Sequence, residues 1–201
     1  MKPTIDKFIM VKNVFNKDFC DQLILNLQKN EWKTHFWYGK NSYGGKKVII
    51  DNSDFAVVYN QELQDLMIPY IRQFLLEYIS KINNENPCLY GCSGYEDNEP
   101  HYFINEYSKI RFNRYDEGKT IKKHIDHIHD LFDGTKKGIP VLSLVGVFND
   151  DYKGGEFIMW DDTLIPLKCG DIVCFPSLFM YQHQVKPIIS GSRYSWVQWI
   201  F

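Results

Sequence analysis

The C-terminal half of the chain is a succession of short apolar runs separated by turn residues, and this pattern limits the fold more than any other feature. Runs such as VLSLVGVFN, DIVCF and RYSWVQWIF are divided by turns such as DDYKGG, KCGD and ISGS. Short β-prone runs at close spacing, without helices between them, are typical of antiparallel sheets. We therefore predict a mainly β (α+β) chain, with an antiparallel sandwich or jelly roll over residues 105–201.

Two helices are predicted before this region. The segment NKDFCDQLILNLQKN follows a short strand in FIMVKNVF, and Asn16 is a suitable N-cap for it. DLMIPYIRQFLLEYISKIN has the stronger helical periodicity, and we place its start at Asp65 so that Pro69 falls in the first turn. We expect residues 1–85 to be a strand and helical support region packed on one sheet, within a single domain of 201 residues.

Composition limits the class of protein. Hydrophobic residues make up 44% of the chain, enough for a core without disulfide bonds. The net charge is −2 and no basic stripe is visible, so we expect no nucleic-acid partner. We also expect no membrane association, because no apolar run reaches transmembrane length. The five cysteines are odd in number and no signal peptide is visible, which indicates reduced thiols in a cytoplasmic protein.

A histidine- and aspartate-rich segment, KKHIDHIHDLFDG, suggests a metal site. In an extended segment residues i and i+2 point to the same side, so His124 and Asp126 can bind one ion. His183, in the predicted strand YQHQV, is the candidate third ligand. Two histidines and one carboxylate are the ligand set of non-haem Fe(II) oxygenases, whereas zinc more often takes three histidines or histidine with cysteine. The segment lacks the pattern of a calcium loop, and a hydrated surface turn is the alternative.

Arg193 follows His183 on the next predicted strand and is a candidate anion-binding residue. A guanidinium holds a carboxylate by two parallel hydrogen bonds, and Ser195, on the same face, can donate a third. A metal with open positions near this arginine suits a small dicarboxylate such as 2-oxoglutarate. The alternative is an ion pair between Arg193 and a structural carboxylate such as Asp171.

These residues stand in a longer pattern that resembles the 2-oxoglutarate/Fe(II) dioxygenases of the prolyl 4-hydroxylase type. The pattern comprises YDEGKTIKKHID, the hairpin GGEF, PLKCGDIVCF and HQVKPIISGSRYSWVQW. It covers residues 105–201, and before them only FIMVKNVFNKDFCDQLI is similar. DDYKGGEFIMW and the end of the chain are similar to a bacterial and viral-like branch that hydroxylates unassigned substrates.

The resemblance implies a double-stranded β-helix (jelly roll) that uses Fe(II), 2-oxoglutarate and O2, with L-ascorbate as a reductant. The implied metal ligands are His124, Asp126 and His183, and the implied cofactor-binding residues are Arg193, Tyr115, Ser195 and Trp199. Some members carry a second tyrosine where Val147 stands here, so we expect that cosubstrate contact to be missing. Phe157, Val147 and Val185 are candidates for the apolar lining.

The function implied by the resemblance is hydroxylation of a C–H bond. A prolyl residue of a polypeptide is the first expected substrate, and a free small molecule is the alternative. Loops 34–60 and 86–103 are where we expect an extended peptide to be held. A second class is a cupin-like metal-binding module without oxygenase activity. A third is a nucleic-acid demethylase, which usually carries a second arginine soon after the anchor; RYSWVQWIF has none.

Overall fold

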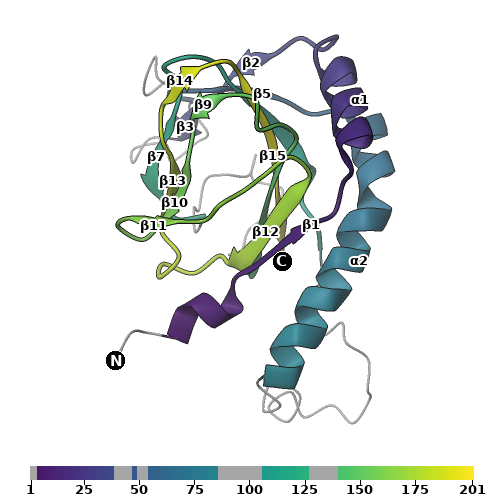
Figure 1. The fold of residues 1–201 in the computed structure, drawn as a ribbon, viewed down its shortest axis with the longest axis vertical. Coiled ribbons are helices and arrows are strands. Elements are labelled where there is room, and N and C mark those ends of the chain that lie inside the picture. The colour runs from purple at the N-terminus through teal and green to yellow at the C-terminus, as the bar shows by residue number, and fades with distance from the viewer. Residues whose placement is uncertain (1–3, 39–46, 49–53, 86–105, 127–139) are drawn as a thin grey trace.

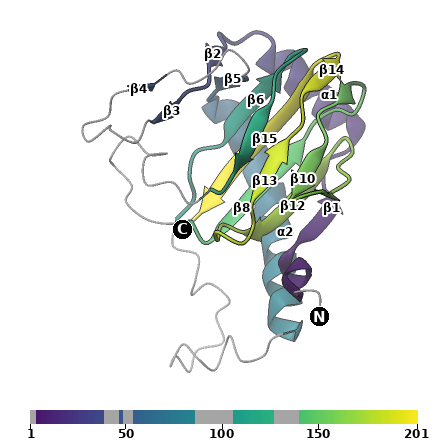
Figure 2. The same cartoon turned by 90° about the vertical axis from the view of Figure 1, so that its left-hand side faces the viewer.

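The structure is a computed structural model that describes residues 4–38, 47–48, 54–85, 106–126 and 140–201. In this part of the chain two antiparallel sheets face each other, and two α-helices lie on the outer side of the larger sheet (Figure 1). Figure 2, turned by 90° about the vertical axis from Figure 1, shows β13 and β10 in front of β15 and β8, with α2 behind them. The predicted jelly roll with helices on one sheet is confirmed.

The larger sheet has seven strands, and residues far apart in the sequence form it. Its order is β1 (Met10–Asn13), β12 (Asp171–Pro176), β8 (Leu142–Val147), β15 (Arg193–Ile200), β6 (Arg111–Tyr115), β5 (Ala56–Val58) and β2 (Lys33–Thr34). The N-terminal region thus contributes strands at both edges of this sheet, in addition to the helices.

The smaller sheet has four strands and carries the histidines. Its order is β11 (Thr163–Leu164), β10 (Phe157–Met159), β13 (His183–Val185) and β7 (Ile121–His124). Two strand pairs complete the described sheets: β14 (Ile188–Ser190) with β9 (Lys153–Gly154), and β3 (Trp37–Tyr38) with β4 (Lys47–Val48).

Alternation along the strands gives the larger sheet two different faces. In β15, Trp196 and Ile200 belong to a core shared with the helices, whereas Val197 and Trp199 belong to a core between the sheets. A one-residue shift of register would exchange these faces, so the alternation fixes which side chains of β15 point between the sheets.

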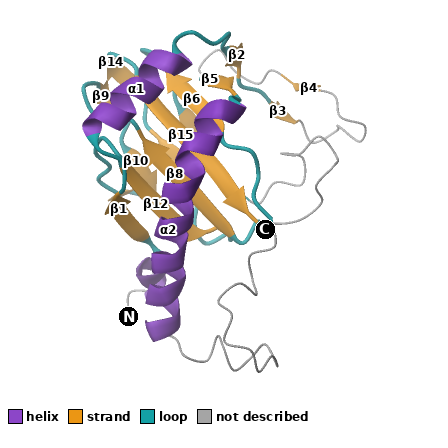
Figure 3. Cartoon of the chain, turned by 90° about the vertical axis from the view of Figure 1, so that its right-hand side faces the viewer, coloured by secondary structure: helices purple, strands orange, loops and turns teal. Residues whose placement is uncertain are grey.

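The helices bury their apolar stripes on the outer face (Figure 3). A short 3-10 helix, Thr4–Phe8, precedes β1. Helix α1 (Lys17–Leu27) begins as predicted, because the Asn16 side chain accepts a hydrogen bond from the Phe19 N–H at 2.8 Å. No helix of the described residues is long and apolar enough to span a membrane.

The predicted start of the second helix is wrong. Helix α2 runs from Gln61 to Glu85, and Asn60 caps it by accepting a hydrogen bond from the Leu63 N–H at 3.0 Å. Pro69 therefore lies inside the helix and leaves the Asp65 carbonyl without its i+4 donor. The apolar stripe extends on both sides of the proline. Its residues are all buried against the sheet: Leu63 and Met67 precede Pro69, and Ile71, Phe74 and Tyr78 follow it. This packing outweighs the local cost of the proline.

Gly146 provides a test of this packing. It lies opposite Trp196 in the sheet, and a Cβ at this position would be 2.1 Å from the indole Nε1. Trp196 is fully buried and has no room to move, so we expect Gly146→Ala to lower the free energy of unfolding by about 3 kcal/mol. Urea unfolding measures this value. Gly118→Ala is the control, because its Cβ meets nothing within 4 Å and only the positive φ of 76° opposes it; this strain costs about 1 kcal/mol. Equal losses in the two variants would contradict the steric explanation.

Candidate metal centre

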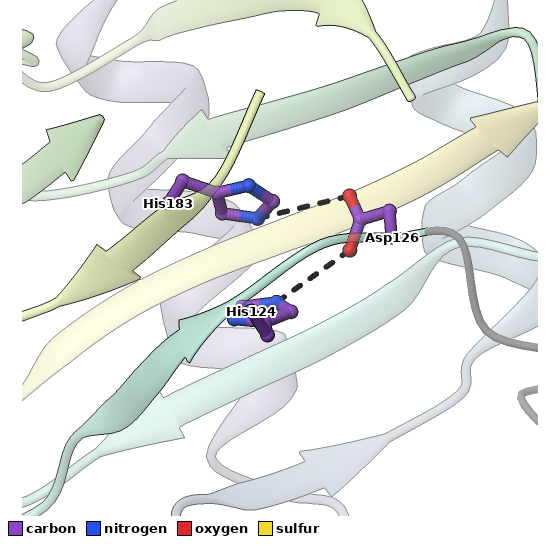
Figure 4. A group of neighbouring side chains, drawn as sticks. All are labelled: His124, Asp126 and His183. Carbon is purple, nitrogen blue, oxygen red and sulfur yellow. Dashed lines mark ion pairs between the residues drawn. The ribbon is translucent and has the colours of Figure 1, made fainter. Parts of the chain in front are cut away.

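His124, Asp126 and His183 come together at one end of the smaller sheet (Figure 4). Strands β7 and β13 are antiparallel neighbours, and their register places His183 directly opposite His124. Asp126 follows in the bend just after β7 ends, and its side chain turns back toward both imidazoles. The structure therefore unites the three predicted ligands, although only the two histidines lie within strands and Asp126 lies in the bend after β7.

The geometry of the three side chains suits a cation. His124 Nε2 is 3.5 Å from Asp126 Oδ1, and His183 Nε2 is 3.7 Å from Asp126 Oδ2. All three ligand atoms lie within 4.8 Å of one another. Nitrogen and oxygen ligands about 2.1 Å from one ion are about 3 Å apart at right angles and about 4 Å apart across it. The two measured separations lie between these limits.

Backbone hydrogen bonds fix the tautomers of both histidines. The Nδ1 atom of His124 lies 2.8 Å from the Lys122 carbonyl, and that of His183 lies 3.0 Å from the Tyr181 carbonyl. A carbonyl oxygen can only accept, so each Nδ1 carries the proton. Each Nε2 then presents its lone pair to the centre, which is the arrangement of metal-binding histidines.

Asp126 supplies the charge of the centre. Its Oδ2 atom is buried and has no hydrogen-bond partner among the described residues. Burial raises the pKa of this carboxyl, but His183, His124 and the Ser143 hydroxyl outweigh burial and lower the pKa below its ordinary value. Burial lowers the pKa of His183 to about 4, so this imidazole is neutral at pH 7. A buried, unpartnered carboxylate beside a neutral imidazole fits a divalent cation.

Arg193 is the buried cation of the inner face. Its exposed fraction is 1%. Its Nη1 donates to Ser195 Oγ at 2.7 Å and its Nε donates to Tyr152 Oη at 3.2 Å, while Nη2 is buried without a partner. Asp171 instead accepts from Asn13 and from the Lys168 N–H. The alternative ion pair with Asp171 is therefore absent, and the free Nη2 fits a carboxylate from outside the chain.

The other predicted cofactor residues divide into two groups. Tyr115 lies opposite Arg193 in the sheet, with its ring 5.4 Å from the guanidinium carbon, and Ser195 bonds to Arg193 directly. Trp199 lies further along β15, opposite Ser143, and contacts Arg111 instead. The structure thus brings Tyr115 and Ser195, but not Trp199, to the guanidinium of Arg193.

Tyr152 is a site residue that the sequence analysis missed. It stands just before the Gly-Gly hairpin, and its hydroxyl bonds to Arg193. A Cβ at Gly155 would lie 3.3 Å from Arg193 Cδ, so the hairpin closely approaches this arginine. That closeness makes a tyrosine beside the hairpin a predictable neighbour. Val147, opposite Ser195, has no hydroxyl to offer, as predicted.

The inner face of the larger sheet carries a second group of side chains near the site. In this group Arg111 contacts His35 and Phe55. His35 and Phe55 come from the predicted loop 34–60 and stack with centroids 4.3 Å apart. Phe55 also stacks on Tyr115 at 4.4 Å. Residues 39–46 and 49–53 of this segment, the whole of the predicted loop 86–103, and the histidines His127 and His129 lie outside the described residues.

His35 gives the fold a predictable sensitivity to acid. Burial, the Arg111 charge and His124 lower its pKa to about 2. The unfolded histidine takes up a proton as the pH falls through about 6.5, while the folded one stays neutral until about pH 2. The stability that neutral His35 contributes is therefore complete above about pH 6.5 and is lost below it, by about 1.4 kcal/mol per pH unit.

We therefore expect metal-free protein to lose less stability between pH 6.5 and 5 when His35→Gln is introduced. The difference from wild type is expected to be about 2 kcal/mol over this interval, since glutamine has no proton to take up. Urea unfolding at pH 7, 6 and 5, with chelator present, measures it. The other buried histidine, His183, is common to both proteins and cancels in the difference. Parallel pH profiles would exclude His35 as the responsible group.

The fold and this site together define a class. A double-stranded β-helix with two histidines and an aspartate converging between its sheets, and a buried arginine on the facing strand, is the arrangement of a non-haem oxygenase that uses a diacid cosubstrate. The sequence profile of the 2OG-Fe(II) oxygenase superfamily matches residues 110–201. This match and the similarity to PKHD-type hydroxylases support a 2OG-Fe(II) oxygenase, which implies the use of Fe(II), 2-oxoglutarate and O2.

Relatives of known sequence agree with this assignment. A PKHD-type hydroxylase of Acinetobacter baumannii is 26% identical over 199 residues, which covers 94% of this chain and 76% of the relative. A PKHD-type hydroxylase of Delftia acidovorans is 38% identical over 98 residues, which covers 44% of this chain and 41% of the relative. The chain thus spans less than half of the length of the Delftia relative.

Solved structures share the fold at low identity. A prolyl hydroxylase from Trichoplax adhaerens, in complex with a hypoxia inducible factor peptide fragment, has a TM-score of 0.63 at 18% identity, covering 97% of this chain and 84% of that one. A Pseudomonas putida prolyl-4-hydroxylase has a TM-score of 0.62 at 16% identity, covering 96% and 91%.

Proposed function

We propose that the protein hydroxylates a C–H bond of its substrate at Fe(II) held by His124, Asp126 and His183. The observation that carries this proposal is a pair of buried, unpartnered atoms of opposite charge, Asp126 Oδ2 and Arg193 Nη2. The first suits a cation and the second suits an anion, and a metal-chelating diacid such as 2-oxoglutarate satisfies both at once. Bound iron would supply the redox chemistry that couples decarboxylation of the cosubstrate to oxidation of the C–H bond.

The residues of the chain bind, orient and exclude water. Arg193 binds the distal carboxylate of 2-oxoglutarate, and Ser195 and Tyr152 hold its guanidinium in place. Tyr115 covers this arginine with its ring. Phe157 packs 5.4 Å from the His183 ring and would give a bound metal an apolar neighbour. The burial of Arg193, Ser195 and Tyr115 strengthens the electrostatic contacts of the cosubstrate.

For the substrate, we propose a prolyl residue of a polypeptide. The support is the similarity of fold to prolyl hydroxylases, one of them in complex with a peptide fragment. Residues 1–201 are proposed to act as one dioxygenase domain, since strands from both halves of the chain build the larger sheet. A cytoplasmic location is proposed as well, and the free thiols of Cys20, Cys169 and Cys174 support it. A free small molecule is the second candidate substrate, favoured by the buried arginine described in the next subsection.

A turnover assay tests this function. Proline-rich peptides, Fe(II), 2-oxoglutarate and L-ascorbate as reductant are expected to give succinate and a peptide heavier by one oxygen atom. Mass spectrometry of the peptide and a succinate assay provide the two readouts. Succinate no higher than the peptide-free background with every peptide would reject the polypeptide substrate.

Metal binding without turnover would instead favour a cupin-like module. Under nitrogen, Fe(II) and 2-oxoglutarate are expected to give a weak visible absorption band, because the cosubstrate chelates the iron. A protein that binds zinc but gives neither this band nor succinate would be a metal-binding module rather than an oxygenase.

A further inference from the structure

A second buried arginine, Arg111, lies on the inner face of the larger sheet and takes no part in the cosubstrate site described above. Its exposed fraction is 8%. Its guanidinium carbon lies 5.4 Å from the ring centroid of Phe55 and 5.1 Å from that of Trp199. Two aromatic faces therefore hold the guanidinium, an arrangement that fixes its plane while leaving its N–H edge available.

The residues that the structure describes leave the charge of Arg111 without a balancing carboxylate. Its Nε donates to Asn113 Oδ1 at 3.0 Å, and its Nη1 lies 3.2 Å from His35 Nε2. Asparagine is uncharged, and the low pKa of about 2 keeps His35 neutral, so His35 accepts through Nε2. Among the residues that the structure describes, no carboxylate forms an ion pair with Arg111. A guanidinium has five N–H donors, and only two are engaged here.

The position of Arg111 relative to the metal centre indicates what it can reach. Arg193 pairs with Tyr115 at one end of the β15–β6 ladder, and Arg111 pairs with Val197 four residues further along, about 13 Å away. Trp199, which touches Arg111, pairs with Ser143, and the Ser143 hydroxyl interacts with Asp126. Arg111 therefore lies on the Asp126 side of the centre, and Arg193 anchors the opposite end of the inner face.

We propose that Arg111 binds a carboxylate of the substrate. Arg193 is engaged by the cosubstrate in the proposed function, so this second, unbalanced guanidinium is available for a second anion. Because Arg111 contacts Trp199, whose neighbour Ser143 interacts with Asp126, we expect the hydroxylated carbon to lie near the carboxylate in the substrate. A free amino acid or other small carboxylic acid meets this requirement, and so does a C-terminal or acidic residue of a peptide.

This inference rests on the proposed function for its chemistry, but binding tests it separately. The protein is loaded with Fe(II) and saturating 2-oxoglutarate under nitrogen, and probes are titrated by calorimetry. The probes are pairs that differ only in charge: N-acetylproline and its amide, a blocked proline–glutamate dipeptide amide and its proline–glutamine counterpart, and isobutyrate and isobutyramide. We expect at least one acid to bind roughly 10- to 100-fold more tightly than its neutral partner, the value of a charge-assisted hydrogen bond.

The variants identify the residue responsible. Arg111→Gln is expected to abolish the preference for the acid, and Arg111→Lys to retain part of it, since lysine keeps the charge but not the planar fork. Arg114→Gln is the matched control: it lies on the same strand, points to the outer side and pairs with Asp116. It is expected to keep the wild-type preference. The wild-type comparison needs no variant, so it remains decisive if Arg111→Gln does not fold.

The outcomes separate the two proposals. If the acid binds more tightly than the amide in the proline pair, Arg111 recognises the α-carboxylate of a free or C-terminal residue. If the acid binds more tightly in the dipeptide pair, Arg111 recognises an acidic side chain of a peptide. Preference in the isobutyrate pair alone keeps the role of Arg111 and rejects proline as the substrate. Equal binding of every acid and amide, no binding of any acid, or an unchanged preference in Arg111→Gln would overturn the role of Arg111, whatever the turnover assay shows.

Discussion

Asp126→Ala is expected to weaken metal binding strongly and, with it, to abolish turnover. The variant removes the only carboxylate of the cluster and leaves two histidine ligands. A four-ligand zinc site is worth about 10–16 kcal/mol, so the loss of one ligand is expected to weaken metal affinity by roughly 100- to 1,000-fold. Anaerobic Fe(II) titration measures the affinity, and the visible band with 2-oxoglutarate is expected to disappear.

Thermal unfolding of the same variant distinguishes a lost ligand from a damaged fold. Interactions with His183, His124 and the Ser143 hydroxyl lower the pKa of Asp126, so the variant is expected to have a modestly lower metal-free Tm than the wild type, and the test is the further rise in Tm when metal is added. Metal at 100 times its Kd stabilises the wild type by about 2.7 kcal/mol, and this gain is expected to be absent from the variant. Asp161→Ala is the control, because Asp161 is an exposed partner of Lys123. A metal-dependent rise in Tm that persists in Asp126→Ala would contradict the assignment of this ligand.

The jelly roll was predictable because its signal is local. Alternating residues such as those of RYSWVQWIF define both faces of β15 without any knowledge of its neighbours. The convergence of His124 with His183 followed from the same logic, since both lie in strands of a fold that pairs them. Asp126 reached the cluster by a different route from the predicted one: β7 ends at His124, and a bend rather than an extended strand places the carboxylate.

The missed features depend on contacts between distant segments. Asn60 and Asp65 are both able to cap a helix, and only the buried stripe from Leu63 decides in favour of Asn60. The environment of Arg111 combines a histidine and a phenylalanine from the N-terminal half with a tryptophan from the last strand. No spacing rule connects these residues, because their proximity arises from the pairing of β5 with β6 and of β6 with β15.

Arg193→Met is expected to weaken 2-oxoglutarate binding while leaving metal affinity unchanged. The guanidinium lies on a strand of the larger sheet, apart from the three metal ligands, and its buried Nη2 is available to the cosubstrate. Loss of one partner of a buried charged pair costs about 2–5 kcal/mol, so we expect the Kd of 2-oxoglutarate to rise roughly 100-fold or more. Anaerobic calorimetry measures the Kd of 2-oxoglutarate on the Fe(II)-loaded protein and, in a separate titration, the Kd of Fe(II) on the metal-free protein.

Graded variants show whether the charge of Arg193 or only its packing matters. Arg193→Lys is expected to bind 2-oxoglutarate about tenfold more weakly, because it keeps the charge and loses the planar fork. Tyr152→Phe removes the single hydrogen bond that Tyr152 accepts from Arg193 Nε, and it is expected to raise the Kd of 2-oxoglutarate about fivefold. Without cosubstrate, Arg193→Met is expected to be as stable as wild type or more stable, since it replaces a buried guanidinium that has no carboxylate partner among the described residues. A Kd for 2-oxoglutarate that stays at the wild-type value in Arg193→Met would remove Arg193 from the cosubstrate site, and with it half of the charge complementarity on which the proposed function rests.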